Sequence, residues 1–200
     1  TTAQCGPLLM VEGHLLARQA EIEQWFRAQW LATPPPFYAS VDLRNSGFKL
    51  APVDTNLFPA GFNNLNPAFQ PLCIQAIQAA VERFCPRACG ILVVPESHTR
   101  NIYYLENLAS FIHLLELAGF QVHVGSLLPE ITAPQTISLP SGRQITLQPL
   151  TRNGNRIQAG RHAPCFVLLN NDLSGGVPEI LRGLEQPVVP PVALGWVTRR

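Results

Sequence analysis

Two arginines and four acidic residues stand where this sequence could hold a small zwitterion. A free amino acid needs a bidentate donor for its α-carboxylate, and the guanidinium of Arg44 or Arg100 can fill that role. Its ammonium group needs an acidic or carbonyl oxygen. The acidic residues available are Asp42, Asp54, Glu96 and Asp172. A structural role competes for each of them, because Asp and Asn after strands often cap helices or stabilise turns.

Three polar loops, at 42–45, 96–101 and 170–176, carry all of these residues except Asp54. In an open α/β sheet, ligands bind beyond the carboxyl ends of the strands, so the concentration of polar residues there indicates a binding site. The first loop leads into an Asn-rich stretch, 44–67, which we expect to be a structured loop with apolar anchors. The candidate substrate-binding residues are Asp42, Arg44, Asn45, Lys49, Asp54, Asn56, Asn63, Asn64, Glu96, His98, Arg100, Asn101, Asn171 and Asp172.

The sequence assigns no catalytic residue and no metal ligand. His98 could act as a general base, but no nucleophilic Ser or Cys stands at a recognisable elbow, and a polar loop histidine is the simpler interpretation. No GxxxxGK[ST] or GxGxxG motif is present, so ATP binding cannot be argued from this chain alone. The cysteines include no CxxC pair. Cys85 and Cys89 could form a redox pair, although idle thiols are favoured.

Composition narrows the class of protein further. The chain has 200 residues, 46% of them hydrophobic, which is enough for one domain with a sizeable core. Charged residues make up only 14% and the formal net charge is +1, so nucleic acid and anionic membranes are not expected partners. The sequence has neither a run of eighteen apolar residues nor a secretory signal pattern, and we expect a cytoplasmic location.

The elements that must position these residues follow from the hydrophobic pattern. Apolar residues from Pro7 to about Leu31 recur at helical spacing, which predicts one long amphipathic helix or two short ones. The prolines at 34–36 end it, and 37–43 alternates as a strand does. We therefore predict a helical segment over 1–33 and an α/β domain over 34–200.

The α/β domain should contain a mainly parallel sheet. A helix is expected from about Pro71 to Phe84, a buried strand at 91–94, a second helix capped by Gly119, and a strand at 120–124. The stretch 137–157, with its Asn153-Gly154 turn, predicts inserted antiparallel hairpins. A core strand at 165–169 follows, and then a short helix near 178–184.

Thirty consecutive residues carry a family resemblance. The run from Pro36 to Leu65, which contains SVDLRNSGFKLAPVDTNLFPAGFNN, is similar to the signature of the proteobacterial glutamate-cysteine ligases. Further similarity lies in PESHTRN at 95–101 and in 169–200. The resemblance therefore spans nearly the whole chain, and it implies a three-layer α/β domain like the one that precedes the ATP-binding lobes of ATP-grasp ligases.

The resemblance also implies an activity. Such ligases use ATP and Mg²⁺ to activate the γ-carboxylate of L-glutamate as an acyl phosphate, which the amine of L-cysteine attacks in the first step of glutathione synthesis. We expect the ATP-grasp half to follow Arg200, so the isolated chain should be inactive. Loops 42–64 and 96–101 would contribute to the amino-acid pocket. The alternative is a non-catalytic α/β module that binds an amino acid or a partner. Assembly into a homo-oligomer is a further possibility.

Overall fold

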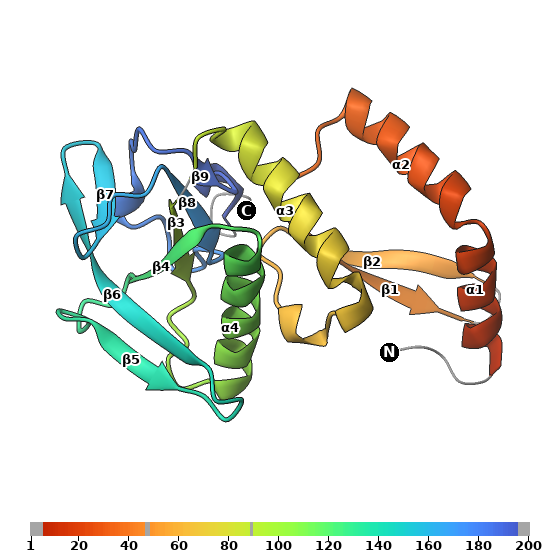
Figure 1. Cartoon of the computed structure of the whole chain (residues 1–200), viewed down its shortest axis with the longest axis horizontal. Coiled ribbons are helices and arrows are strands. Elements are labelled where there is room, and N and C mark those ends of the chain that lie inside the picture. Colours follow the sequence, from red (N-terminus) through yellow and green to blue (C-terminus); the bar gives the residue numbers. More distant parts are fainter. Residues whose placement is uncertain (1–5, 47–48, 89, 196–200) are drawn as a thin grey trace. The chain divides into compact units, whose positions relative to one another are not determined.

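The computed structural model describes residues 6–46, 49–88 and 90–195. The chain divides into two compact units, Thr1–Asn56 and Leu57–Arg200, called unit 1 and unit 2 below. Figure 1 shows unit 1 in red to orange and unit 2 in yellow to blue. The boundary between the units lies inside the α/β domain expected over 34–200. The possible Cys85–Cys89 pair, against which idle thiols were favoured, involves Cys89, which lies outside the described residues.

Unit 1 consists of two helices and a hairpin. The helical pattern forms the shorter alternative, α1 (Gly6–Ala17) and α2 (Gln19–Ala32). The helix α2 stops before the three prolines, with the Thr33 N–H still donating to the Gln29 carbonyl. Two strands, β1 (Ser40–Asn45) and β2 (Leu50–Asn56), then pair antiparallel in a sheet of their own.

The β1–β2 hairpin corrects the expectation of a structured loop over 44–67. Within the stretch 44–67, the residues Leu50–Asn56 form strand β2. The polar segment 42–45 was expected to follow a strand, but it lies within β1. Pro52 made a strand look improbable, because proline cannot donate to a ladder. The two-stranded sheet tolerates it, since both strands are edges and the register shifts beside the Leu43–Pro52 pair.

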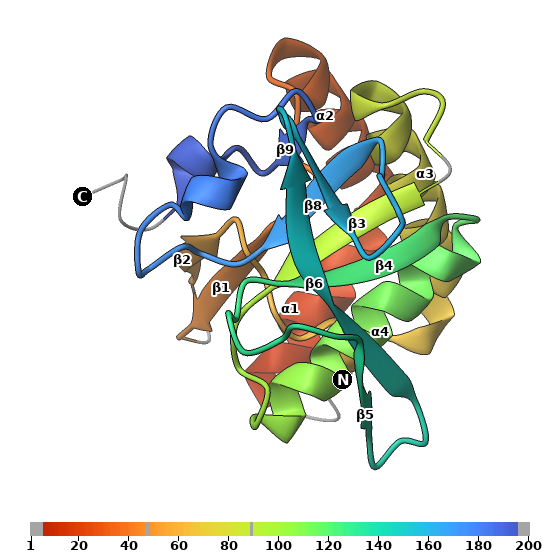
Figure 2. The same cartoon turned by 90° about the vertical axis from the view of Figure 1, so that its left-hand side faces the viewer.

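Unit 2 is built on a seven-stranded mixed sheet with the order β5-β6-β4-β3-β8-β9, and β7 pairs with β6 (Figure 2). The pairs β3–β4, β3–β8, β4–β6 and β8–β9 are parallel. This confirms the predicted α/β class with a mainly parallel sheet. The strands are β3 (Gly90–Pro95), β4 (Gln121–Ser126), β5 (Gln135–Ser138), β6 (Gln144–Asn153), β7 (Arg156–Ala159), β8 (Phe166–Asn170) and β9 (Val188–Val189).

Two helices and four single turns complete the described part of unit 2. The helices α3 (Gln70–Phe84) and α4 (Ile102–Leu117) form where the pattern predicts them, and Gly119 ends α4 with a φ of 97°. The short helix expected near 178–184 is only a 3₁₀ turn. The 3₁₀ turns are η1 (Phe62–Asn64), η2 (Pro67–Phe69), η3 (Glu179–Leu181) and η4 (Val192–Leu194).

The central strands β3 and β8 are buried on both faces, as their continuous apolar sequences indicate. On one face, Leu92 and Val167 join a cluster that includes Ile157 of β7 and Leu181 of η3. Side chains alternate along a strand, so Ile91 and Val93 of β3 point to the opposite face. The buried residues of α4 are Leu105, Asn107, Leu108, Ala109, Phe111, Leu114 and Leu115.

The inserted hairpins form as predicted. Strand β5 pairs antiparallel with β6, and β6 pairs antiparallel with β7. The turn lies one residue later than predicted, because Asn153 pairs with Arg156 and the turn residues are Gly154, with a φ of 58°, and Asn155. The sequence did not indicate that β6 also pairs parallel with β4, between Val124 and Leu147. In the described part of the chain no helix is long and apolar enough to cross a membrane.

Candidate functional site

The carboxyl ends of β3 and β8 bring two of the three predicted loops together. Pro95 pairs with Asn170 at the end of the parallel ladder, so the loops that follow both strands begin side by side. Glu96 opens the first loop, and Asn171 with Asp172 opens the second. This edge of the sheet is where α/β proteins hold ligands.

The acidic side chain that opens the first loop contacts the backbone of the second loop at this edge. One carboxylate oxygen of Glu96, Oε1, accepts a hydrogen bond from the Asp172 N–H at 2.7 Å. Burial raises the pKa of Glu96, the nearby Asp172 charge raises it further, and the Asp172 N–H bond opposes both effects. The two nearby negative charges favour a cation beside them, although Oδ1 of Asp172 also accepts from the Ser174 N–H at 2.8 Å. An ammonium group is such a cation.

A buried hydroxyl ties the edge to the loop before η1. The Tyr104 hydroxyl accepts from the Glu96 N–H at 2.8 Å and lies 3.2 Å from Oδ1 of Asn170, to which it can donate. Burial raises the pKa of Tyr104 well above its usual value, so the hydroxyl keeps the proton that it donates. Nδ2 of Asn170 donates to the Pro59 carbonyl at 3.0 Å. The loop is therefore fixed against the sheet edge.

Asn107 of α4 holds the next part of the same loop. Its Oδ1 accepts from the N–H groups of Gly61 at 2.6 Å and Phe62 at 2.8 Å. The ring of Phe62 stacks on Phe111 with 4.3 Å between the centroids. Gly61 has a φ of 92°, which a side chain would strain. These contacts determine where η1, with Asn63 and Asn64, lies on unit 2.

The remaining predicted residues of the edge divide into two groups. Asn101 caps α4 by accepting from the Tyr104 N–H, and buried Asn171 bonds the Pro95 carbonyl and the Leu173 N–H. These side chains are already used within the chain. His98 is exposed and meets Tyr104 edge-on, with 5.7 Å between ring centroids. Arg100 is exposed and forms no ion pair within the described ranges.

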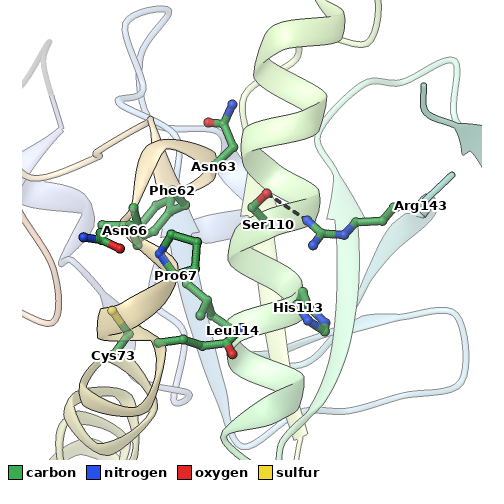
Figure 3. Close-up of a pocket in the computed structure, with 11 residues that line it drawn as sticks. Phe62, Asn63, Asn66, Pro67, Cys73, Ser110, His113, Leu114 and Arg143 are labelled. Atoms are coloured by element: carbon green, nitrogen blue, oxygen red, sulfur yellow. Dashed lines mark hydrogen bonds between the residues drawn. The ribbon is translucent and has the colours of Figure 1, made fainter. Parts of the chain in front are cut away.

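A cavity of about 180 Å³ opens beside η1 and is shown in Figure 3. It lies among η1, η2, α3, α4 and the turn between β5 and β6. Nη1 of Arg143 donates to Ser110 Oγ at 2.9 Å, and this hydroxyl in turn donates to the Glu106 carbonyl at 2.9 Å. The polar lining residues are Asn63, Asn66, Gln70, Ser110, His113 and Arg143. Of these, the sequence indicated only Asn63.

The predicted residues of unit 1 lie on the hairpin. Asp42 pairs directly with Asp54, and alternation along β1 places Arg44 on the same face as Asp42. Like charges directly opposite each other repel, so this polar face favours a bound cation or the neighbouring guanidinium. Asn45 ends β1 and Asn56 ends β2. Lys49 lies in the turn, where its carbonyl accepts from the Ser46 N–H at 3.0 Å.

The comparison with family models decides the family. The glutamate-cysteine ligase model, named GshA, matches residues 12–200. The chain belongs to the glutamate-cysteine ligase family. A solved structure assigned as a gamma-glutamylcysteine synthetase, from Methylobacillus flagellatus KT, is 57% identical with a TM-score of 0.86. The match covers 100% of this chain and 47% of that one, so the chain spans about half the length of this relative. A search of curated proteins gives no match.

Sequence reasoning did not identify several residues of the candidate site in this glutamate-cysteine ligase family member. Asn107 carried a signal, since it is an amide inside the apolar face predicted for a helix. Asn170 belongs to the polar loop predicted at 170–176 but was not among the candidate binding residues, and it ends a buried strand. Tyr104 and Arg143 carried none, because their roles depend on partners 66 and 33 residues away.

Proposed function

We propose that this glutamate-cysteine ligase family member takes part in the ATP-dependent joining of the L-glutamate γ-carboxylate to the amine of L-cysteine. The observation that carries the proposal is the 57% identity to a gamma-glutamylcysteine synthetase over the full chain. Identity at this level over 200 residues supports a shared substrate class as well as a shared fold. The cytoplasmic location is still a prediction made from the sequence. The same holds for a homo-oligomer.

The carboxyl edge of β3 and β8 is the proposed position for an amino-acid substrate. Glu96 and Asp172 receive the ammonium group, and Arg100 receives the α-carboxylate. The raised pKa of Glu96 supports this assignment, because an ammonium beside the carboxylate lowers that pKa again. Substrate binding and ionisation of Glu96 are then coupled, and each favours the other.

The described residues do not fit a site for Mg²⁺. Within these residues no three His, Cys, Asp or Glu side chains gather as a metal site requires, and the sequence has no phosphate-cradling motif. ATP and Mg²⁺ stay predicted cofactors of the activity. We assign the activation of the γ-carboxylate to no residue of this chain.

The test is ADP release and product formation in the presence of glutamate, cysteine and ATP. The whole gene product and the chain of residues 1–200 are assayed side by side, and the dipeptide is identified by mass. We expect turnover that needs both amino acids from the whole product, and none from residues 1–200. Turnover by the short chain would contradict the assignment of chemistry outside it.

A second candidate is a module that only binds an amino acid. The donors and acceptors at the edge of β3 and β8 would serve it equally well. Glutamate binding by calorimetry, without ADP release from the whole gene product under any combination of substrates, would favour this module over the ligase.

A further inference from the structure

A second polar cavity lies at the opposite edge of the same sheet. It has a volume of about 320 Å³ and is lined where the parallel strands begin, by Gly90 of β3, Gln121 of β4 and Cys165 before β8. Strand β3 runs from Gly90 to Pro95, so the two edges are roughly 16 Å apart at about 3.3 Å per residue. This cavity is therefore separate from the candidate amino-acid site.

The lining of this cavity is cationic. It contains Arg87, Arg156 and Arg161 together with His123 and His162, and no Asp or Glu. The whole sequence has a formal net charge of only +1, so this concentration is a local feature. The three guanidiniums come from separate segments: the loop after α3, strand β7 and the turn before β8.

These guanidiniums keep most of their donors available. None of the three arginines pairs with a carboxylate among the residues that the structure describes. Among the bonds between described residues, only Arg156 of the three is held, by a long bond of 3.4 Å from Nη2 to the Pro164 carbonyl. Gathering three unpaired cations costs free energy through repulsion, and a bound anion would remove that cost.

The two histidines form a stacked pair inside the cavity. Their ring centroids are 3.8 Å apart and the planes are inclined by 15°. Burial lowers the pKa of His123, and the charge of His162 lowers it further. The other ionisable groups that face the pair are the three arginines and the Cys165 thiol, which donates to the Gly90 carbonyl at 3.3 Å. An anion among these groups would favour both imidazolium forms.

We propose that the cavity at the amino edge of β3, β4 and β8 binds a small phosphate-bearing anion. A carboxylate offers two oxygens and is satisfied by one guanidinium fork, whereas a terminal phosphate offers three oxygens to donors from several directions. Arg87, Arg156 and Arg161 supply those directions. The volume admits a small metabolite and excludes a polymer.

Calorimetric titration of the protein with pyrophosphate tests the site at low ionic strength. Arg87→Gln and Arg161→Gln should each weaken pyrophosphate binding about tenfold or more, the loss of one charge-assisted contact. Both side chains are exposed, so the melting temperature should not change. Arg83→Gln, at the end of α3 and outside the cavity, is the matched control and should bind as the unaltered protein does.

Three results would overturn the proposal: no pyrophosphate binding at millimolar concentration, equal losses in Arg83→Gln, or citrate binding more tightly than pyrophosphate. The last would replace phosphate by a polycarboxylate. Binding is measured without turnover, so the result does not depend on the proposed ligase activity.

A second measurement uses sulfate, whose charge is constant between pH 5.5 and 8. Sulfate should bind more tightly as the pH falls below about 6.5, because burial lowers the pKa of His123 and the bound anion favours its protonated ring. His162→Gln should flatten this dependence. Sulfate affinity that is independent of pH in the unaltered protein would remove the histidines from the site.

Discussion

Glu96 accepts a hydrogen bond from the backbone N–H of Asp172 at 2.7 Å, although the two residues are 76 positions apart in the sequence. The bond joins the ends of two central strands and holds one carboxylate close to another. Burial raises the pKa of Glu96 above its ordinary value of 4.5. Burial of the charged form of this carboxylate therefore costs stability.

Glu96→Gln should make the protein more stable at pH 7. A carboxyl whose pKa is raised in the folded state binds more protons folded than unfolded, so its contribution to the unfolding free energy falls as the pH rises from about 4.5 to the raised pKa. Glutamine removes this loss and keeps an oxygen that can accept from the Asp172 N–H. Urea unfolding at pH 4 and pH 7 measures the difference.

The gain of Glu96→Gln over the unaltered protein should be larger at pH 7 than at pH 4. Glu82→Gln, on the exposed face of α3, serves as the control and should show no such trend. A gain that is equal at both pH values would contradict the burial of a charged Glu96. In the whole enzyme the same variant should bind glutamate more weakly, so stability and substrate use should change in opposite directions.

Arg100→Lys should raise the Michaelis constant for glutamate in the whole enzyme about tenfold or more, because lysine keeps the charge but loses the planar fork. Arg44→Lys tests the second predicted guanidinium in the same way. Initial rates at varied glutamate give the constants, and Arg83→Lys is the control. Normal glutamate use, or a lowered melting temperature, would assign that arginine a structural role.

Asn107→Ala should lower the unfolding free energy of unit 2 by about 3 kcal/mol. The substitution leaves the N–H groups of Gly61 and Phe62 without their acceptor, at about 1 to 3 kcal/mol for each buried donor. Asn66→Ala also removes an acceptor of one N–H, that of Ala68, but at an exposed position. It should cost less than about 1 kcal/mol. Equal losses in urea unfolding would show that the loop is not fixed by Asn107.

Gly125→Ala should destabilise unit 2 by about 1 to 3 kcal/mol through overpacking. A Cβ at this position of β4 would meet the Leu150 side chain, and it would lie 2.9 Å from Cδ1 of Leu92. Gly13→Ala in α1 meets nothing within 4 Å and should be neutral or stabilising by up to about 1 kcal/mol. Thermal unfolding of both variants measures the effect. A loss of stability in Gly13→Ala together with no loss in Gly125→Ala would contradict the packing described.

Local signals explain which parts of the fold could be predicted. The apolar run Ile91–Val94 is too short for a helix and favours a buried strand, and Gly154 supplies the positive φ that the tight turn between β6 and β7 needs. The strand Leu50–Asn56 was missed because Pro52 and the surrounding Asn residues resemble loop sequence. Only the two-stranded setting, with both edges open, makes that proline acceptable.

The candidate site was less accessible to sequence reasoning for a different physical reason. The residues after strand ends were visible, and Glu96 does meet Asp172. The side chains that hold the loop before η1 were not visible, since Asn170 reaches Pro59 across 111 residues and Asn107 reaches Gly61 across 46. Such contacts depend on the topology of the sheet and leave no local pattern.

The parallel pairing of β3 with β8 also bears on synthesis of the chain. Gly90 and Cys165, at the start of these strands, are 75 residues apart. At about 5 to 20 residues per second, a ribosome needs roughly 4 to 15 s to make that stretch, whereas chain collapse takes at most about 100 μs. During those seconds the apolar run Ile91–Val94 lacks one of its two neighbours. Nascent chains paused before Phe166 should therefore associate with one another or recruit chaperones.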